Sequence, residues 1–138
     1  MSLVLDSSAA LAWVFSDEAA PDMDVVFDQV AERGAVVPSL WILEIANALT
    51  VAVRRERITR NERDDALADL AALDVSIDPE TEQHAWKATL QLADRHGLSV
   101  YDASYLELAQ RKRLPLVTLD HALVRAAEAA SVDVLPKG

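Results

Sequence analysis

Short apolar runs alternate along the chain with longer amphipathic segments. The apolar runs have the length of buried strands and occupy residues 3–5, 35–37, 75–77, 115–118 and 132–135. Between them, apolar residues recur every three or four positions, which predicts helices at residues 9–15, 22–33, 39–53, 59–73, 79–97, 101–113 and 119–130. Short strands separated by helices are typical of a parallel sheet covered on both faces. We therefore expect a three-layer α/β/α domain around a central parallel sheet of four to five short strands.

Local signals indicate where several helices begin and which side of a helix is apolar. Ser7 is expected to cap the first helix, and the segment that starts at Thr59 has the form of a capping box. Asp78, followed by a proline, is expected to cap the helix at residues 79–97. In the helix at residues 39–53, the periodicity predicts a buried apolar face made of Leu40, Leu43, Ala46, Leu49 and Val53, with Ile45 beside it.

Length and composition narrow the class of protein. The chain has 138 residues, enough for one domain with a real core, and it contains no repeat or linker, so we expect one domain at residues 1–138. Cysteine is absent, which excludes disulfides, thiol catalysis and cysteine-bound zinc. The longest apolar run, residues 9–15, is far shorter than the roughly 20 residues that span a membrane. The N-terminus also has no basic segment of the kind that begins a secretory signal. We expect a cytoplasmic protein that does not enter a membrane.

The charge of the chain bears on nucleic-acid binding. With 13 basic and 23 acidic side chains the net charge is −10, which argues against a broad basic surface for nucleic acid. That inference holds only if the acidic side chains are ordinary surface groups. Basic residues gather in two places, and the candidates for RNA contact among them are Arg54, Arg55, Arg57, Arg111, Lys112 and Arg113. Solvated helix ends and contacts with an RNA backbone are equally good explanations of these two groups.

Four acidic residues stand at positions that suggest a site. Asp6 and Asp120 each follow an expected strand, and open parallel sheets bind ligands beyond the carboxyl ends of their strands. Glu44 lies in an apolar helix in which Asn47 is the only other polar residue between positions 39 and 50. Asp102 begins another helix. Each of the four could be a helix cap or a solvated side chain when taken alone.

Taken together, the four carboxylates would place several negative charges in one cleft. Like charges at short range do not all ionise unless a cation joins them or some of them take up protons. A donor set made only of carboxylates is one that Mg²⁺ prefers, and Mn²⁺ would also suit it. The three histidines do not have a zinc-binding spacing, and we expect them to be solvated surface groups.

Four segments of the chain resemble the signature segments of the PIN-domain nucleases: residues 4–9, the helix with Glu44 and Asn47, residues 101–109, and residues 115–120. They are most similar to the VapC-type ribonuclease toxins of type II toxin–antitoxin systems. The resemblance implies an Mg²⁺-dependent endoribonuclease in which Asp6, Glu44 and Asp102 bind the metal. Asp120 would complete that site or help to bind a second metal.

The resemblance also implies supporting residues and partners. Ser7 or Thr118 could hydrogen-bond a metal-binding carboxylate or a phosphate, although a capping or turn hydrogen bond explains either hydroxyl equally well. Asn47 would lie in the wall of the site. A VapB-like antitoxin would block the cleft, and a homodimer is expected from the family.

Other classes of α/β protein fit the sequence less well. A phosphoacceptor receiver domain has two adjacent acidic residues after its first strand, whereas Ser7 follows Asp6 here. A phosphatase of the haloacid dehalogenase type has a second aspartate two residues after the first, and that position is Ser8. A PIN-like interaction module without activity is a third alternative, and the presence of all four acidic residues argues against it.

Overall fold

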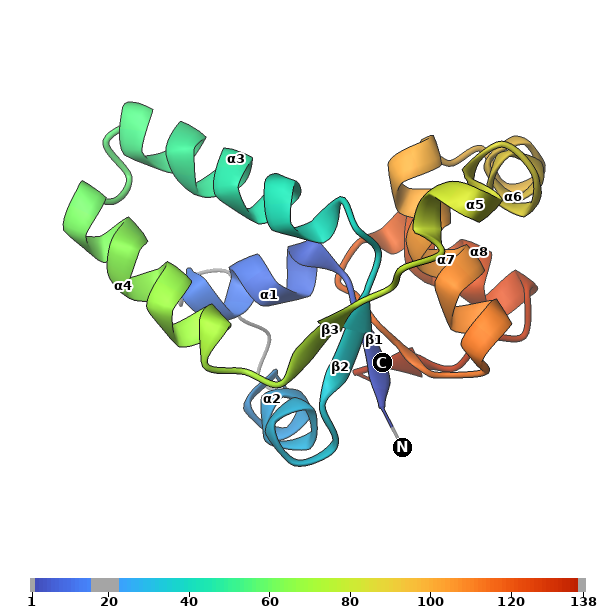
Figure 1. The fold of residues 1–138 in the computed structure, drawn as a ribbon, viewed down its shortest axis with the longest axis horizontal. Coiled ribbons are helices and arrows are strands. Elements are labelled where there is room, and N and C mark those ends of the chain that lie inside the picture. The colour runs from blue at the N-terminus through green and yellow to red at the C-terminus, as the bar shows by residue number, and fades with distance from the viewer. Residues whose placement is uncertain (1, 16–22, 137–138) are drawn as a thin grey trace.

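The computed structural model describes residues 2–15 and 23–136. Its centre is a parallel sheet of five strands in the order β3-β2-β1-β4-β5 (Figure 1). The strands are β1 Leu3–Leu5, β2 Ala35–Val37, β3 Val75–Ile77, β4 Leu116–Val117 and β5 Val134–Leu135. This confirms the expected α/β architecture and the number of strands.

Strand β1 lies in the middle of the sheet. Val4 aligns with Val36 of β2 on one side and with Leu116 of β4 on the other. All three residues of β1 are fully buried, which explains why this strand has no polar side chain. The chain runs outward from β1 through β2 to β3 and then returns to β4, so the strand order reverses between β1 and β4. A ligand-binding crevice is expected at that point, beyond the carboxyl ends of these two strands.

Helices cover both faces of the sheet. Figure 1 shows the first four helices on one side of it and the last four on the other. Their bounds are α1 Ser7–Val14, α2 Met23–Arg33, α3 Trp41–Arg54, α4 Arg60–Ala71, α5 Thr81–Ala85, α6 Ala88–His96, α7 Val100–Lys112 and α8 His121–Ala129. No helix in the described part of the chain is long and apolar enough to cross a membrane.

One expected helix differs in the structure, and one expected helix limit lies outside the described residues. The helix predicted at residues 79–97 is divided into α5 and α6, because Lys87 has backbone angles φ −123° and ψ −102°, outside the helical region. The predicted start of the second helix, Asp22, lies outside the described residues. The capping box at the start of α4 is present. The backbone N–H of Glu62 donates to the Thr59 hydroxyl at 3.1 Å, and the backbone N–H of Thr59 donates to the Glu62 carboxylate at 2.9 Å.

The apolar face predicted for α3 was wrong. The side chains that α3 buries are Trp41, Ile45, Leu49 and Ala52, whereas Leu43 is 74% exposed. Nearly every position of this helix is apolar, and the structure places the large indole ring of Trp41 in the core rather than Leu43. The helix is therefore rotated relative to the prediction, and Ile45 and Leu49 are shared by the predicted and the observed faces.

A cluster of two buried acids and one partly buried arginine joins α7 to the end of β3. We call Asp78, Glu107 and Arg111 the buried ion cluster. The Arg111 guanidinium donates to Asp78 at 2.5 and 3.2 Å and to Glu107 at 2.8 and 3.1 Å. Asp78 is 2% exposed and Glu107 is 5% exposed. Burial by itself would raise the pKa of Asp78, but the hydrogen bonds from Arg111 hold that pKa below its usual value.

The buried ion cluster corrects two expectations from the sequence. Asp78 is not the residue before α5, although its carboxylate accepts a hydrogen bond from the backbone N–H of Glu80 at 3.2 Å. The guanidinium of Arg111 is occupied inside the protein, so we leave Arg111 out of the candidate RNA-contacting surface.

Candidate active site

Asp6 lies at the centre of the site, directly after β1. It is 3% exposed and is the residue before α1. The hydroxyls of Ser8 and Thr118 both donate to its Oδ2 atom, at 2.6 and 2.7 Å. Burial raises the pKa of Asp6, the two hydroxyls oppose that rise, and the negative charges of Glu44 and Asp120 add to it. Asp6 is therefore a buried carboxylate that is well oriented but has no cation beside it in these contacts.

Glu44 projects from α3 and is partly buried. The phenol hydroxyl of Tyr105 donates to its Oε1 atom, and the hydroxyl of Ser7 also hydrogen-bonds this carboxylate. Burial raises the pKa of Glu44, and repulsion from Asp102 raises it further, while the two hydroxyls lower it. The rotation of α3 described above brings Glu44 toward α7 and α1.

Asp102 and Asp120 complete the set from the other side of the sheet. Asp102 lies in the first turn of α7, where its backbone N–H donates to the hydroxyl of the capping residue Ser99 at 3.0 Å. Burial raises the pKa of Asp102, and repulsion from Asp6 and Asp120 raises it further. Asp120 caps α8, since its Oδ1 accepts the backbone N–H of Leu123 at 3.1 Å. One oxygen of Asp120 is therefore used in the fold.

These interactions show that the structure brings the four acidic residues together. Asp6 is close enough to Glu44, Asp102 and Asp120 for charge repulsion to shift pKa values. Each acid comes from a different part of the chain: the end of β1, helix α3, the start of α7 and the loop after β4. The reversal of strand order between β1 and β4 gathers them at one edge of the sheet.

The donor chemistry of this group fits a hard divalent cation. Four carboxylates with mutual repulsion would be stabilised by Mg²⁺ or Mn²⁺. Within residues 2–15 and 23–136, no group of three or more acidic or histidine side chains is already arranged to hold a metal ion. Mg²⁺ commonly keeps several waters and binds proteins through one or two carboxylates, so it does not require all four acids as direct ligands.

Two of the three predicted supporting residues contact the site carboxylates, and two other hydroxyl donors were missed. Ser7 and Thr118 each hydrogen-bond a site carboxylate, while Asn47 is exposed one turn along α3 from Glu44. The sequence reasoning overlooked Ser8 and Tyr105, whose hydroxyls donate to Asp6 and Glu44. Tyr105 has a signal in the sequence, because it stands three residues after Asp102 and so on the same side of α7.

The basic candidates lie away from the four carboxylates. Arg54 is ten residues after Glu44 on α3, about 15 Å along the helix axis. Arg113 ends α7, at the other end of that helix from Asp102. Arg57 stacks over the ring of Phe15, with its guanidinium carbon 4.2 Å from the ring centre. RNA contacts by Arg54, Arg55, Arg57, Lys112 and Arg113 stay a prediction, and they would fall outside the immediate site.

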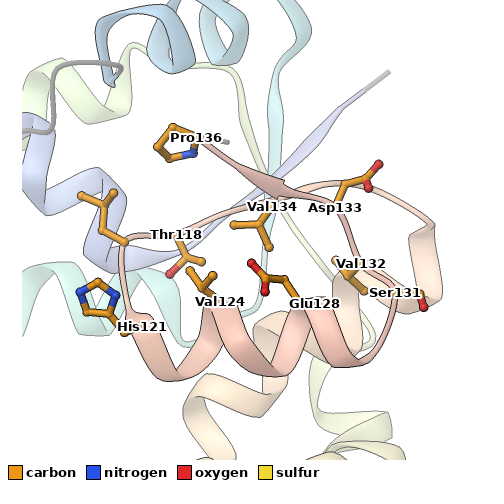
Figure 2. A pocket seen from close by; sticks show the side chains of 10 residues that line it. Thr118, His121, Val124, Glu128, Ser131, Val132, Asp133, Val134 and Pro136 are labelled. Atoms are coloured by element: carbon orange, nitrogen blue, oxygen red, sulfur yellow. The ribbon is translucent and has the colours of Figure 1, made fainter. Parts of the chain in front are cut away.

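A cavity of about 700 Å³ runs beside the site along α8 and β5 (Figure 2). Thr118 lines it and also donates to Asp6, but none of the four site carboxylates lines the cavity. Figure 2 shows Val124 and Glu128 projecting from α8 toward β5. Because Glu128 and Asp133 both line this cavity, it is poorly suited to a phosphate backbone.

Known proteins share this sequence pattern and this fold. The family model of the PIN domain matches residues 3–129. "Ribonuclease VapC3" of Pyrobaculum aerophilum is 30% identical over 89% of this chain and 92% of its own. "Ribonuclease VapC9" of Mycobacterium tuberculosis is 31% identical over 98% of this chain and 99% of its own.

Among solved structures, the Pyrobaculum aerophilum protein PAE2754 aligns with a TM-score of 0.69 and 25% identity, covering 97% of this chain and 83% of that one. VapBC2 from Rickettsia felis, bound to a DNA fragment from its promoter, aligns with a TM-score of 0.68 at 10% identity, over 97% of both chains. The second likeness concerns the fold alone. The family match covers all four acidic residues and removes the receiver-like alternative, and the chain belongs to the PIN domain family.

Proposed function

We propose that this protein is an Mg²⁺-dependent endoribonuclease of the VapC type that hydrolyses RNA phosphodiester bonds. The observation that carries the proposal is the meeting of Asp6, Glu44, Asp102 and Asp120 at the point where the strand order reverses, with raised pKa values for the first three. Membership of the PIN domain family and similarity to proteins named VapC ribonucleases support it.

The four carboxylates differ in how many of their oxygens are free of hydrogen bonds within the fold and could bind the metal. The hydroxyls of Ser8 and Thr118 share Oδ2 of Asp6, which leaves Oδ1 for the metal. Glu44 and Asp102 would contribute from the facing helices, and Asp120 would act through the oxygen that does not cap α8. When bound, Mg²⁺ supplies stabilisation of charge on the phosphate and a water of lowered pKa. Mn²⁺ would suit the same oxygen donors.

The proposed reaction is hydrolysis of a phosphodiester, in which a water molecule attacks phosphorus on the side opposite the leaving oxygen. The water oxygen forms a bond to phosphorus while the bond from phosphorus to the 3′ oxygen breaks, and the departing oxygen takes a proton to become a 3′-hydroxyl. The other product carries a 5′-phosphate. In this reaction the residues of the chain would orient the carboxylates. Thr118, which is 1% exposed, would hold the Asp6 carboxylate in place through its hydrogen bond to Oδ2.

A basic antitoxin is the partner that the charge distribution favours. The net charge is −10 and four of the acidic side chains gather at the site, so an arginine or lysine from a partner would be attracted to it. Similar folds occur in VapBC complexes from Rickettsia felis and Salmonella typhimurium. We propose a VapB-like antitoxin that inhibits the enzyme, and a homodimer as the assembly of the chain itself.

The experiment compares RNA cleavage by the wild type and by Asp6→Asn and Asp102→Asn, each with Mg²⁺ and with EDTA. We expect cleavage only by the wild type with Mg²⁺, with all three proteins folded by circular dichroism. Asp94→Asn is the matched control, because Asp94 is exposed on α6 and outside the site. If the two site variants cleave RNA as fast as this control, the proposal is wrong, and the inactive-module alternative follows if no protein cleaves.

A further inference from the structure

We propose that Tyr105 is a positioning residue that holds the Glu44 carboxylate in its metal-binding orientation. The inference rests on the proposed function, because it takes Glu44 to be a metal ligand. It assigns a task to a side chain that neither binds the metal itself nor touches the RNA.

The geometry makes Tyr105 a fixed donor. Its side chain is 0% exposed, and its neighbours on α7 from Ala103 to Ala109 are all buried, so the ring is held by the core. Its hydroxyl donates to Oε1 of Glu44, which lies 61 positions away in the sequence on a different helix. The bond thus joins α3 to α7, the two helices that carry Glu44 and Asp102.

Glu44 needs such a partner because its own side chain is flexible. A glutamate has three rotatable bonds, and a partly buried one on the cleft wall could turn outward to water. A phenol is protonated at neutral pH and can only be displaced from the carboxylate by moving the packed ring. Hydrogen bonds from such outer groups set the orientation of metal ligands.

The kind of donor is informative. The structural acids Asp78 and Glu107 are paired with the cation of Arg111, and the hydroxyl of Thr81 also donates to Asp78 at 3.0 Å. Asp6 and Glu44 instead have only neutral hydroxyls as side-chain donors among the residues that the structure describes: Ser8 and Thr118 for Asp6, Ser7 and Tyr105 for Glu44. A neutral donor orients a carboxylate without cancelling the negative charge that attracts a metal. The hydroxyl set is therefore suited to metal binding rather than to stability alone.

The test measures metal binding directly. Mn²⁺ is titrated into metal-free wild type, Tyr105→Phe and Tyr101→Phe, and free Mn²⁺ is followed by electron paramagnetic resonance. We expect Tyr105→Phe to raise the Mn²⁺ Kd by about 10- to 100-fold, the range for loss of an outer hydrogen bond to a ligand. Tyr101→Phe removes the same atom from the same helix, but Tyr101 is 66% exposed, so its Kd is expected to match the wild type.

The outcomes separate the inference from the proposed function. If the wild type binds Mn²⁺ and Tyr105→Phe binds it equally well, Tyr105 does not position Glu44. If the wild type itself binds no Mn²⁺, the proposed function fails first. RNA cleavage by Tyr105→Phe should also recover as Mg²⁺ is raised, because the variant loses metal affinity and keeps every ligand. A loss that no Mg²⁺ concentration restores argues against a positioning role.

A second measurement leaves Tyr105 in place. The chain has two tyrosines, so Tyr101→Phe labelled with ¹³Cζ-tyrosine gives one resonance, from Tyr105. Adding Mg²⁺ should shift this resonance and saturate with the metal Kd, because a metal on Glu44 withdraws electron density from the oxygen that the phenol contacts. Glu44→Gln should abolish the shift. An unchanged resonance at saturating Mg²⁺ would overturn the inference.

Discussion

Replacement of Arg111 by methionine removes the cation from the buried ion cluster and keeps a side chain of similar length. Two carboxylates would then be left without it, with side-chain exposures of 1% for Asp78 and 7% for Glu107. Breaking one buried ion pair costs about 3–5 kcal/mol. Because this guanidinium serves two buried acids, we expect the free energy of unfolding at pH 7 to fall by about 5 kcal/mol, a large part of the total of about 5–15 kcal/mol for a typical domain.

The assay is urea unfolding followed by circular dichroism, with a matched variant in which all three charges are removed: Arg111→Met, Asp78→Asn and Glu107→Gln. Neutral replacement of a whole buried group is far less costly than removal of one partner, so the triple variant should recover more than half of the loss. A loss below about 1 kcal/mol for Arg111→Met, or a triple variant no more stable than the single one, would refute the reasoning.

The same variant has a defined dependence on pH. In the wild type the pKa of Asp78 is lowered below 3.8, so its stabilising effect is present above that pH and is lost only as the pH falls through the lower folded-state value. In Arg111→Met the Asp78 carboxylate lacks its cation, and burial, no longer opposed by Arg111, would raise the pKa of Asp78. The deficit of the variant should therefore shrink as the pH is lowered from 7 toward 5. An unchanged deficit across this range would count against unpaired charge as its cause.

Three further predictions concern the site and the core. In EDTA the wild type should become more stable as the pH falls from 7 toward 5, because raised folded-state pKa values of Asp6, Glu44 and Asp102 favour proton uptake by the folded protein. Thermal melting at several pH values checks this prediction, and a melting temperature that falls over this pH range contradicts it. Mg²⁺ at 100 times its Kd should stabilise the wild type by about 2.7 kcal/mol, and Asp6→Asn should reduce that gain; equal gains would exclude a metal at Asp6. Leu49→Ala should cost about 2–5 kcal/mol and Leu43→Ala less than about 0.5 kcal/mol in urea unfolding, since only Leu49 is buried; similar costs would mean that the rotation of α3 is wrong.

The sheet could be predicted from the sequence because its strands are short, largely apolar runs, and its central strands β1 and β4 are fully buried. β1 and β4 have no polar residue, so neither needs a neighbouring segment to be recognised. The capping box at Thr59 is equally local. The break between α5 and α6 could not be predicted, since neither Trp86 nor Lys87 is a glycine or proline and the turn is made by the backbone of Lys87.

The face of α3 shows the limit of periodicity. Residues 41–53 include apolar side chains on nearly every side, so a spacing of three or four fits more than one stripe. The choice is made by packing of Trp41 against the core, which depends on elements far along the chain. Glu44 could nevertheless be recognised as a candidate site residue, because an ionised carboxylate in an apolar helix is costly to bury without a partner.

The site was partly visible in the sequence and partly hidden. Asp6 and Asp120 could be found because each follows a strand, and the ends of parallel strands meet at one edge. The hydroxyl donors were harder to find, because Tyr105 stands among apolar residues and has the pattern of a core side chain. Arg111 was misjudged as a surface cation because its partner Asp78 is 33 positions away, and a run of basic residues gives no sign of such a partner.

The position of β4 in the sheet has a consequence for synthesis of the protein. β1 is made first but is flanked on one side by β4, whose residues leave the ribosome more than 110 positions later. Asp6 and Asp120 therefore cannot meet in a nascent chain that ends before β4, and no shorter fragment carries all four acids. The complete set of four carboxylates is therefore assembled only when nearly all of the 138 residues have been made, so the site forms late in the synthesis of the chain.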